Sequence, residues 1–296
     1  MDFGLKKKKS KSMKKLLLLY FVIFGSLNQA FTQELDVKVS GKGPKVILIP
    51  GLASSGEVWD ETVENLSQNF ECHVLTLPGF ADNPATEMSS GFLSTMEKLI
   101  TEYVQTQSEK VTLIGHSLGG FLSLRLSRSL PNKIEKTIIV DSYPFYSAAF
   151  NPAATEENMV EMASQMKDLM LSQSPEQYLA QQEASMPLMT TSKEKLPLAV
   201  EWSMRSDRAT TAQAFFELMT TDFRDKLMEV KTPILVLGAW YSGKNYGMTE
   251  DSVRKTFESQ YQLAENVQIE MAPTAHHFIM WDNPEWFMEK VTGFMK

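Results

Sequence analysis

The stretch that decides the fold is VTLIGHSLGG, from Val111 to Gly120. Its first four residues form a short, largely apolar run, which is typical of a buried strand in a parallel sheet. Apolar residues at helical spacing begin at Leu118 and continue to about residue 130. Ser117 lies between the two patterns, among three glycines whose missing Cβ atoms allow close packing of the backbone. The sequence therefore predicts a strand, a sharp turn that carries Ser117, and a helix.

This stretch contains GHSLG, which matches the pattern G-x-S-x-G. In that pattern a nucleophilic serine sits on a strained turn between a strand and a helix. The unpaired N–H groups at the start of the helix would also stabilise negative charge that develops near the serine. A plain helix cap is the alternative role for Ser117. The strand before it and the helix after it favour a nucleophile.

Strand and helix patterns alternate along the chain as far as Asp141. The expected strands are residues 37–39, 46–49, 73–77, 111–114 and 137–140. The first two are separated by a glycine-containing turn and are expected to form a hairpin or to be neighbours. Strands that alternate with helices predict an α/β fold with a mostly parallel central sheet flanked by helices.

From residue 142 to residue 230 only helical patterns occur. The expected helices are residues 156–171, 175–184, 196–204 and 210–219. Strand character returns at 233–238 and 267–271, and a helix closes the chain at 284–295. An interruption of this length is too long for a connecting loop. The sequence therefore predicts a core of residues 34–141 and 231–296, interrupted by a helical cap insertion at 142–230.

Several motifs together resemble the α/β-hydrolase fold family, and within it the capped serine esterase or haloperoxidase-like branch. They are Pro50-Gly51-Leu52, Leu77-Pro78-Gly79, the stretch from Gly115 to Gly120, Asp222-Phe223-Arg224, and His277-Phe278 ahead of Asp282-Asn283-Pro284. The resemblance covers Val46 to the C-terminus. It implies a serine hydrolase that cleaves a carboxylic ester through an acyl-enzyme intermediate.

A base that activates Ser117 is expected among the four histidines, because imidazole takes up protons best near neutral pH. His276 and His277 follow the last strand, at the sheet edge where the ends of parallel strands gather. The resemblance aligns the base with His277, and places His276 where the family usually has glycine. His73 and His116 are interpreted as packing residues.

Asp141 is the expected acid of the triad. Members of the family usually carry an aspartate shortly after the strand that ends here at Gly238, but residues 239–245 contain no carboxylate. Glu250 and Asp251 come later and have the character of a first helical turn. Asp141 ends the strand after the nucleophile's helix, where some relatives place their acid. The alternative is that Asp141 only braces the chain as it enters the insertion.

Two backbone N–H groups are expected to hold the oxyanion. Leu118, the residue after the nucleophile, supplies one, and the resemblance places the other at Leu52. The sequence shows no metal-ligand spacing and no glycine loop for a nucleotide, so no cofactor and no metal are expected. Nine of the eighteen methionines lie in residues 142–230. They are expected to pack the cap, and some of them to line an apolar pocket for an acyl or alkyl group.

The N-terminal residues 1–33 are interpreted as a secretory signal. A lysine-rich segment precedes an apolar run from Leu16 to Leu27, which is shorter than the ~20 residues that span a bilayer. An uncleaved anchor is the alternative. Removal of these residues takes away seven lysines and one aspartate, and so changes the net charge from −7 to −13. That charge argues against nucleic acid and anionic membranes as partners.

The expected protein is thus secreted or periplasmic, without stable membrane association after signal cleavage, and acts on a small, apolar, ester-like substrate. Hydrolysis of a lactone, a thioester or a carbon–carbon bond on the same fold is an alternative within the enzymes. A protein that binds a small molecule and turns it over slowly is the alternative outside them, because the loop after Gly238 lacks the usual acid.

Overall fold

One seven-stranded sheet organises the chain, and its strand order is β1-β3-β2-β4-β5-β6-β7. The computed structural model describes Met1 and residues 35–296. The predicted signal segment, residues 1–33, lies outside the described residues apart from Met1 and stays a prediction. The strands are β1 (Asp36–Gly41), β2 (Lys45–Ile49), β3 (Glu71–Thr76), β4 (Val111–His116), β5 (Ile134–Val140), β6 (Ile234–Gly238) and β7 (Val267–Met271).

The sheet is parallel except for β1, which pairs antiparallel with β3. The expectation that β1 and β2 are neighbours is wrong, since β3 lies between them. Burial explains the difference. β2 is buried from Val46 to Ile49 and therefore has a strand on each side, whereas the side chains of β1 are mostly exposed, as suits an edge strand.

Helices cover both faces of the sheet. They are α2 (Asp60–Leu66), α3 (Phe92–Gln105), α4 (Leu118–Ser129), α9 (Glu250–Tyr261), α10 (Ile279–Asp282) and α11 (Pro284–Met295). Successive residues of a strand point to opposite faces, so Ile47 and Ile49 pack with α3, α4 and α9, whereas Val46 and Leu48 pack with α2 and α11. Full burial of each such side chain stabilises the fold by about 1.5–3 kcal/mol. The predicted α/β fold is confirmed.

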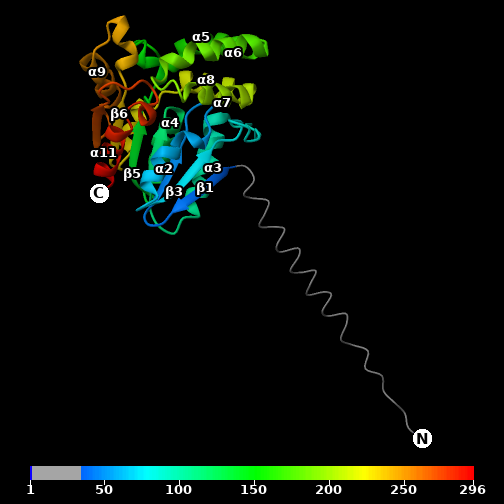
Figure 1. Cartoon of the computed structure of the whole chain (residues 1–296), viewed down its shortest axis with the longest axis vertical. Helices are drawn as coiled ribbons and strands as arrows, with labels where there is room; N and C mark the ends of the chain where they lie inside the picture. Colours follow the sequence, from blue (N-terminus) through cyan, green and yellow to red (C-terminus); the bar gives the residue numbers. More distant parts are fainter. Residues whose placement is uncertain (2–34) are drawn as a thin grey trace. The chain divides into compact units, whose positions relative to one another are not determined.

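The segment between β5 and β6, which the structure describes throughout, contains helices but no strand. Its helices are the short η2 (Tyr146–Ala149), α5 (Glu156–Ser172), α6 (Pro175–Ser185), the short η3 (Met186–Leu188), α7 (Leu196–Arg205), α8 (Arg208–Thr220) and the short η4 (Arg224–Glu229). Figure 1 shows α5 to α8 together at one end of the sheet. The helices predicted from the sequence are therefore present, while the division into core and cap at residues 142 and 230 stays a prediction.

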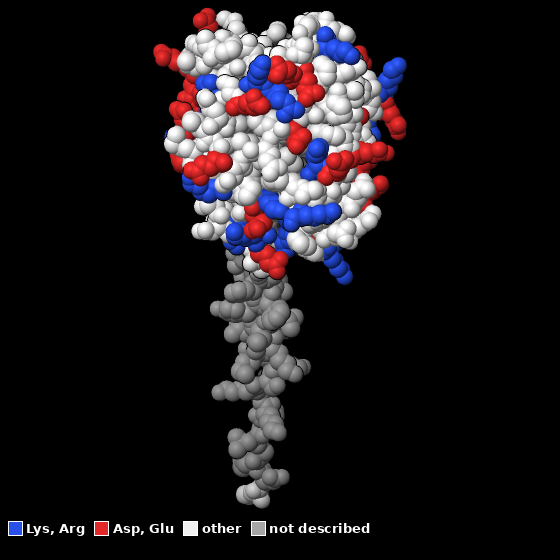
Figure 2. Space-filling view, turned by 90° about the vertical axis from the view of Figure 1, so that its left-hand side faces the viewer, with Lys and Arg blue, Asp and Glu red and all other residues white. Residues whose placement is uncertain are grey.

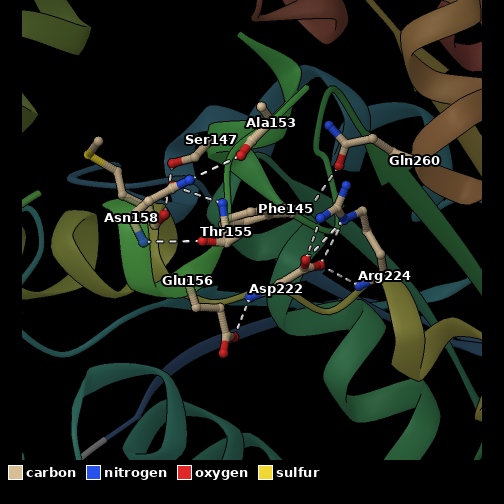
Figure 3. A network of polar contacts seen from close by, with 10 residues as sticks. Phe145, Ser147, Ala153, Thr155, Glu156, Asn158, Asp222, Arg224 and Gln260 are labelled. Carbon is tan, nitrogen blue, oxygen red and sulfur yellow. Dashed lines mark hydrogen bonds and ion pairs between the residues drawn. The ribbon is translucent and has the colours of Figure 1, made fainter. Parts of the chain in front are cut away.

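The two connections of this helical segment to the sheet lie side by side (Figure 3). Phe223 N donates a hydrogen bond to Pro144 O at 2.9 Å, and Asp222 N donates one to Glu156 Oε1 at 2.7 Å. The Arg224 guanidinium is paired with the Asp222 carboxylate. The chain therefore leaves the sheet and returns to it through one bonded joint, which fixes the base of the helical segment.

On the face that carries α9 and α11, acidic and basic side chains are interspersed (Figure 2). The described residues on that face therefore present no large area of a single charge. Among residues 35–296, none of the helices combines the length and the apolar character that crossing a membrane requires.

Replacement of Gly119 by alanine is expected to lower the free energy of unfolding by at least about 2 kcal/mol. A Cβ atom on Gly119 would lie 2.2 Å from Ile49 O, so that α4 and β2 would have to separate. Gly293→Ala in α11 is the matched control. Its Cβ atom would meet nothing within 4 Å, and better helix propensity should stabilise the protein by up to about 1 kcal/mol. Urea unfolding of both variants measures the difference, and equal stabilities would contradict this packing.

Candidate active site

Ser117 sits on the sharp turn between β4 and α4. Its backbone angles are φ 52° and ψ −117°, in a region that side-chain-bearing residues rarely adopt. Such a conformation costs on the order of 1–3 kcal/mol and persists only where the surrounding structure imposes it. Ser117 N donates a hydrogen bond to Val140 O at 2.9 Å, which ties the turn to the neighbouring strand β5. The strained turn predicted from the glycine pattern is thus present.

Asp141 and His277 are hydrogen-bonded to each other. Asp141 Oδ2 lies 2.6 Å from His277 Nδ1, and the two side chains are 14% and 20% exposed. Asp141 Oδ1 accepts a second hydrogen bond from Ala239 N at 2.8 Å. The loop after β6, which carries no carboxylate, thus contributes a backbone donor that holds Asp141. With Nδ1 occupied, Nε2 is the ring nitrogen of His277 that is left for another group.

Ser117 and His277 line the same cavity, which also includes Asp141 and has a volume of about 470 Å³. The ring of His116, the residue before Ser117, lies 4.5 Å from the ring of His277 between centroids. Within residues 35–296 no hydrogen bond joins the Ser117 hydroxyl to His277. Such bonds are often long before substrate binds and shorten in the complex. The structure thus brings the three predicted side chains to one cavity.

Of the two residues predicted to hold the oxyanion, Leu52 lines this cavity and Leu118 directly follows Ser117, which lines it as well. Leu118 is the first residue of α4, so its amide has no partner within the helix. Leu52 lines the cavity, and no backbone acceptor is assigned to its amide among the described residues. Gly51 holds this loop against the turn, since a Cβ atom there would lie 3.3 Å from Ser117 Cβ. Two main-chain amides near Ser117 that have no backbone partner within residues 35–296 are the kind of donors that an oxyanion requires.

His116 has a role that the sequence analysis missed. Its side chain is 1% exposed, and Nε2 lies 3.1 Å from His277 O. A carbonyl oxygen only accepts, so Nε2 carries the proton and donates. Burial, together with the neighbouring His277, lowers the pKa of His116 well below its usual 6.5. The ring is therefore neutral and fixes the backbone of His277. Its position beside Ser117 at the carboxyl end of β4 indicated that it lies near the site, but not which group it bonds.

The two remaining histidines are not brought to the Asp141 pair. His73 Nδ1 lies 2.5 Å from Tyr103 Oη, and His73 Nε2 lies 2.9 Å from Glu71 Oε1. It therefore belongs to a hydrogen-bonded cluster between β3 and α3, which the interpretation as a packing residue did not include. The His276 ring Nδ1 is buried and finds no partner in the described part of the chain.

The cavity wall is mainly apolar and contains no lysine or arginine among the described residues. The helical segment 142–230 supplies many of its large side chains, namely Tyr146, Phe150, Met170, Tyr178, Met186, Leu188, Met189, Phe215 and Leu218. Phe150, Leu188 and Met189 are also exposed to solvent, so the mouth of the cavity is apolar. No three His, Cys, Asp or Glu side chains in residues 35–296 gather as a metal site would require.

The sequence matches the model of the alpha/beta hydrolase family over residues 46–290. It is 25% identical over 256 residues to a pimeloyl-[acyl-carrier protein] methyl ester esterase of Vibrio parahaemolyticus, and the match covers 86% of this chain and 95% of that protein. The protein of the same name from Vibrio campbellii is 26% identical over 197 residues, with 67% and 76% covered.

Solved structures give the same fold. An enol-lactonase from Burkholderia xenovorans superposes with a TM-score of 0.70 at 16% identity, covering 88% of this chain and 96% of that chain. An esterase from Exiguobacterium antarcticum superposes with a TM-score of 0.70 at 18% identity, covering 88% and 94%. These likenesses confirm the fold that the motifs predict.

The neutral His116 predicts a pH dependence of stability. Its pKa is lower in the folded chain than in the unfolded chain, so below about pH 6.5 the unfolded state binds a proton that the folded state does not. Above about pH 6.5 His116 is neutral in both states and the stability is unaffected by its titration. Below that pH the free energy of unfolding decreases as the pH is lowered, by at most about 1.4 kcal/mol per pH unit. His116→Gln should lose this slope and keep an N–H donor. Urea unfolding between pH 7.5 and 5.5 measures it, and identical slopes in wild type and variant would contradict a neutral His116.

Proposed function

The chain belongs to the alpha/beta hydrolase family, and from this we propose that it is a serine hydrolase that cleaves a carboxylic ester through an acyl-enzyme intermediate. One observation carries the proposal. The 2.6 Å hydrogen bond between Asp141 and His277 lies at the wall of the same cavity as the strained turn of Ser117. A carboxylate that orients an imidazole in the same cavity as a serine hydroxyl is the arrangement from which serine is activated as a nucleophile.

In the first half of the reaction, Ser117 Oγ attacks the ester carbonyl carbon and its proton passes to His277 Nε2. Asp141 keeps the Nδ1 proton of His277 in place and stabilises the imidazolium that forms. The carbonyl oxygen becomes an oxyanion and binds the amides of Leu52 and Leu118. The bond from carbon to the alcohol oxygen then breaks, and His277 protonates the departing alcohol.

In the second half, a water molecule gives a proton to His277 Nε2 and attacks the carbonyl carbon of the acyl-serine. The same two amides bind the second oxyanion. Its collapse breaks the bond between Ser117 Oγ and the acyl carbon, and His277 returns the proton to the serine. The carboxylic acid leaves, and the enzyme is restored without a cofactor taking part.

The acyl group of the substrate is proposed to be apolar and uncharged. A free carboxylate in the cavity would meet no lysine or arginine, because the described lining contains neither. Transfer of a charged group from water to a place without a partner is strongly unfavourable. Met170, Met186 and Met189 instead offer adaptable apolar contacts to an alkyl chain. This supports residues 142–230 as a cap over the substrate.

The ester is proposed to be a free small molecule. The Vibrio relatives act, by their names, on an ester attached to acyl-carrier protein. In this chain α5 and α6, which contribute to the cavity wall, carry six acidic residues and one lysine. Such a surface repels a negatively charged carrier that would approach the cavity, whereas an uncharged small ester meets no such barrier. The alternative of a slow ligand-binding protein depended on a missing acid, and the Asp141 contact with His277 weighs against it.

The role of Ser117 is tested with a fluorophosphonate probe and 4-nitrophenyl esters. The wild-type protein should be labelled rapidly, and Ser117→Ala should show neither labelling nor ester hydrolysis above background. Asp141→Asn should fold normally and lose about 10³–10⁴ in kcat, because the histidine would no longer be held in the required tautomer. Asp251→Asn, which changes an exposed acid in the first turn of α9, is the control and should keep wild-type turnover. Labelling that persists in Ser117→Ala would overturn the proposal.

The uncharged acyl group is tested with two substrates of the same shape. These are 4-nitrophenyl pentanoate and the mono-4-nitrophenyl ester of glutaric acid, in which a carboxylate replaces the terminal methyl group. We expect kcat/KM to be at least about 10²-fold higher for the pentanoate, since the carboxylate would be desolvated without a partner. Hydrolysis by Ser117→Ala gives the background for each ester. Comparable kcat/KM values for the two esters would contradict a neutral acyl site.

A further inference from the structure

The loop that carries His277 is bonded directly to the helical segment above it. Asp282, five residues after His277, accepts hydrogen bonds at Oδ1 from Thr190 Oγ1 (2.6 Å) and from Thr191 N (3.0 Å). Its other oxygen, Oδ2, accepts a hydrogen bond from His276 N at 2.8 Å. One carboxylate therefore joins residues 190 and 191 to the residue that precedes His277.

A second bond joins the same two segments on the other side of His277. Phe278 N donates to Met189 O at 3.0 Å. The amides of both neighbours of His277 are thus committed to residues 189–191, one directly and the other through Asp282. Thr190 is 2% exposed, so its hydroxyl bond to Asp282 is shielded from competing water. A shift of residues 189–191 would therefore carry the backbone on either side of His277 with it.

The segment bonded to Asp282 is also part of the cavity wall. Met186, Leu188 and Met189, which directly precede Thr190, line the cavity that contains Ser117 and His277. An acyl chain that fills the cavity would press on these side chains. The chain of contacts is then continuous, from the acyl chain to residues 186–189, through Thr190 and Asp282, to the backbone of His277.

We propose that Asp282 is a positioning residue that couples acyl-chain contact with residues 186–189 to the placement of the His277 imidazole. The inference rests on the proposed function and adds a specificity mechanism to it. Acyl chains long enough to reach residues 186–189 hold His277 in its working position, and acetyl groups do not. The preference for longer acyl chains is then expressed in kcat, whereas a wall that only binds the chain would change KM.

Thr190→Val tests the coupling with little change in shape. Valine removes the hydroxyl, which donates to Asp282 and accepts from Ser192 N at 3.0 Å, and leaves Thr191 N and His276 N to bond Asp282. We expect kcat for 4-nitrophenyl hexanoate to fall about tenfold, as loss of the buried hydrogen bond to Asp282 allows, while kcat for the acetate stays within about twofold. Thr190→Ser keeps the hydroxyl and should retain the wild-type ratio of the two kcat values.

Asp282→Asn adds a second measurement, because an amide cannot accept at both ends. Its hexanoate kcat should fall further, and the double variant with Thr190→Val should be no worse than Asp282→Asn alone, since both substitutions interrupt the same path from Thr190 through Asp282 to His276. Thermal unfolding checks that each variant folds. Equal losses on acetate and hexanoate, or a change in KM alone, would overturn the coupling. A wild-type protein that neither reacts with a fluorophosphonate nor hydrolyses any ester would instead refute the proposed function.

Discussion

Parallel pairing of β4, β5, β6 and β7 is the constraint on which the site depends. Because parallel strands end at the same edge of a sheet, the residues after each of them meet there although they are distant in sequence. Ser117 follows β4, Asp141 follows β5, Ala239 follows β6, and His277 comes a few residues after β7. Each strand thus positions one residue of the site, and the hydrogen bonds between the strands set the distances between these residues.

The same edge also carries the strain of the fold. Ser117 and Asp141 both have positive φ angles, of 52° and 47°, and each comes directly after a buried strand. Backbone hydrogen bonds hold both of them, from Ser117 N to Val140 O and from Asp141 N to Leu237 O. Strained residues persist where neighbouring strands over-determine them. The stability of the buried sheet therefore offsets the conformational cost of the backbone at Ser117 and Asp141.

Much of this arrangement could be predicted from the sequence, because it depends on local patterns. The glycines around Ser117 indicate the sharp turn, and the alternation of strands and helices indicates a parallel sheet. Asp141 could be proposed because it ends a strand beside that turn. The neighbours of β1 could not be predicted, since strand order depends on burial across the whole sheet rather than on the intervening turn.

The contacts of His116 and Asp282 were beyond the reach of sequence reasoning for the same physical reason. His116 bonds the backbone of a residue 161 positions away, and Asp282 bonds Thr190, 92 positions away. Nothing in the local pattern of either residue specifies its partner. Histidine before the nucleophile fits a packing role equally well, and aspartate before Asn283-Pro284 fits a plain helix end. Only the folded chain distinguishes these roles.

His277 is consequently held from several directions by groups of different origin. Asp141 orients its ring, and His116 binds its carbonyl oxygen. Asp282 and Met189 bind the amides of its two neighbours. The first two groups belong to the sheet edge, whereas Met189 and the partners of Asp282 belong to the helical segment. If only the sheet held the His277 imidazole, its position would not change with the group that fills the cavity. Because the helical segment also holds it, the placement of the His277 imidazole depends on the same segment that lines the cavity.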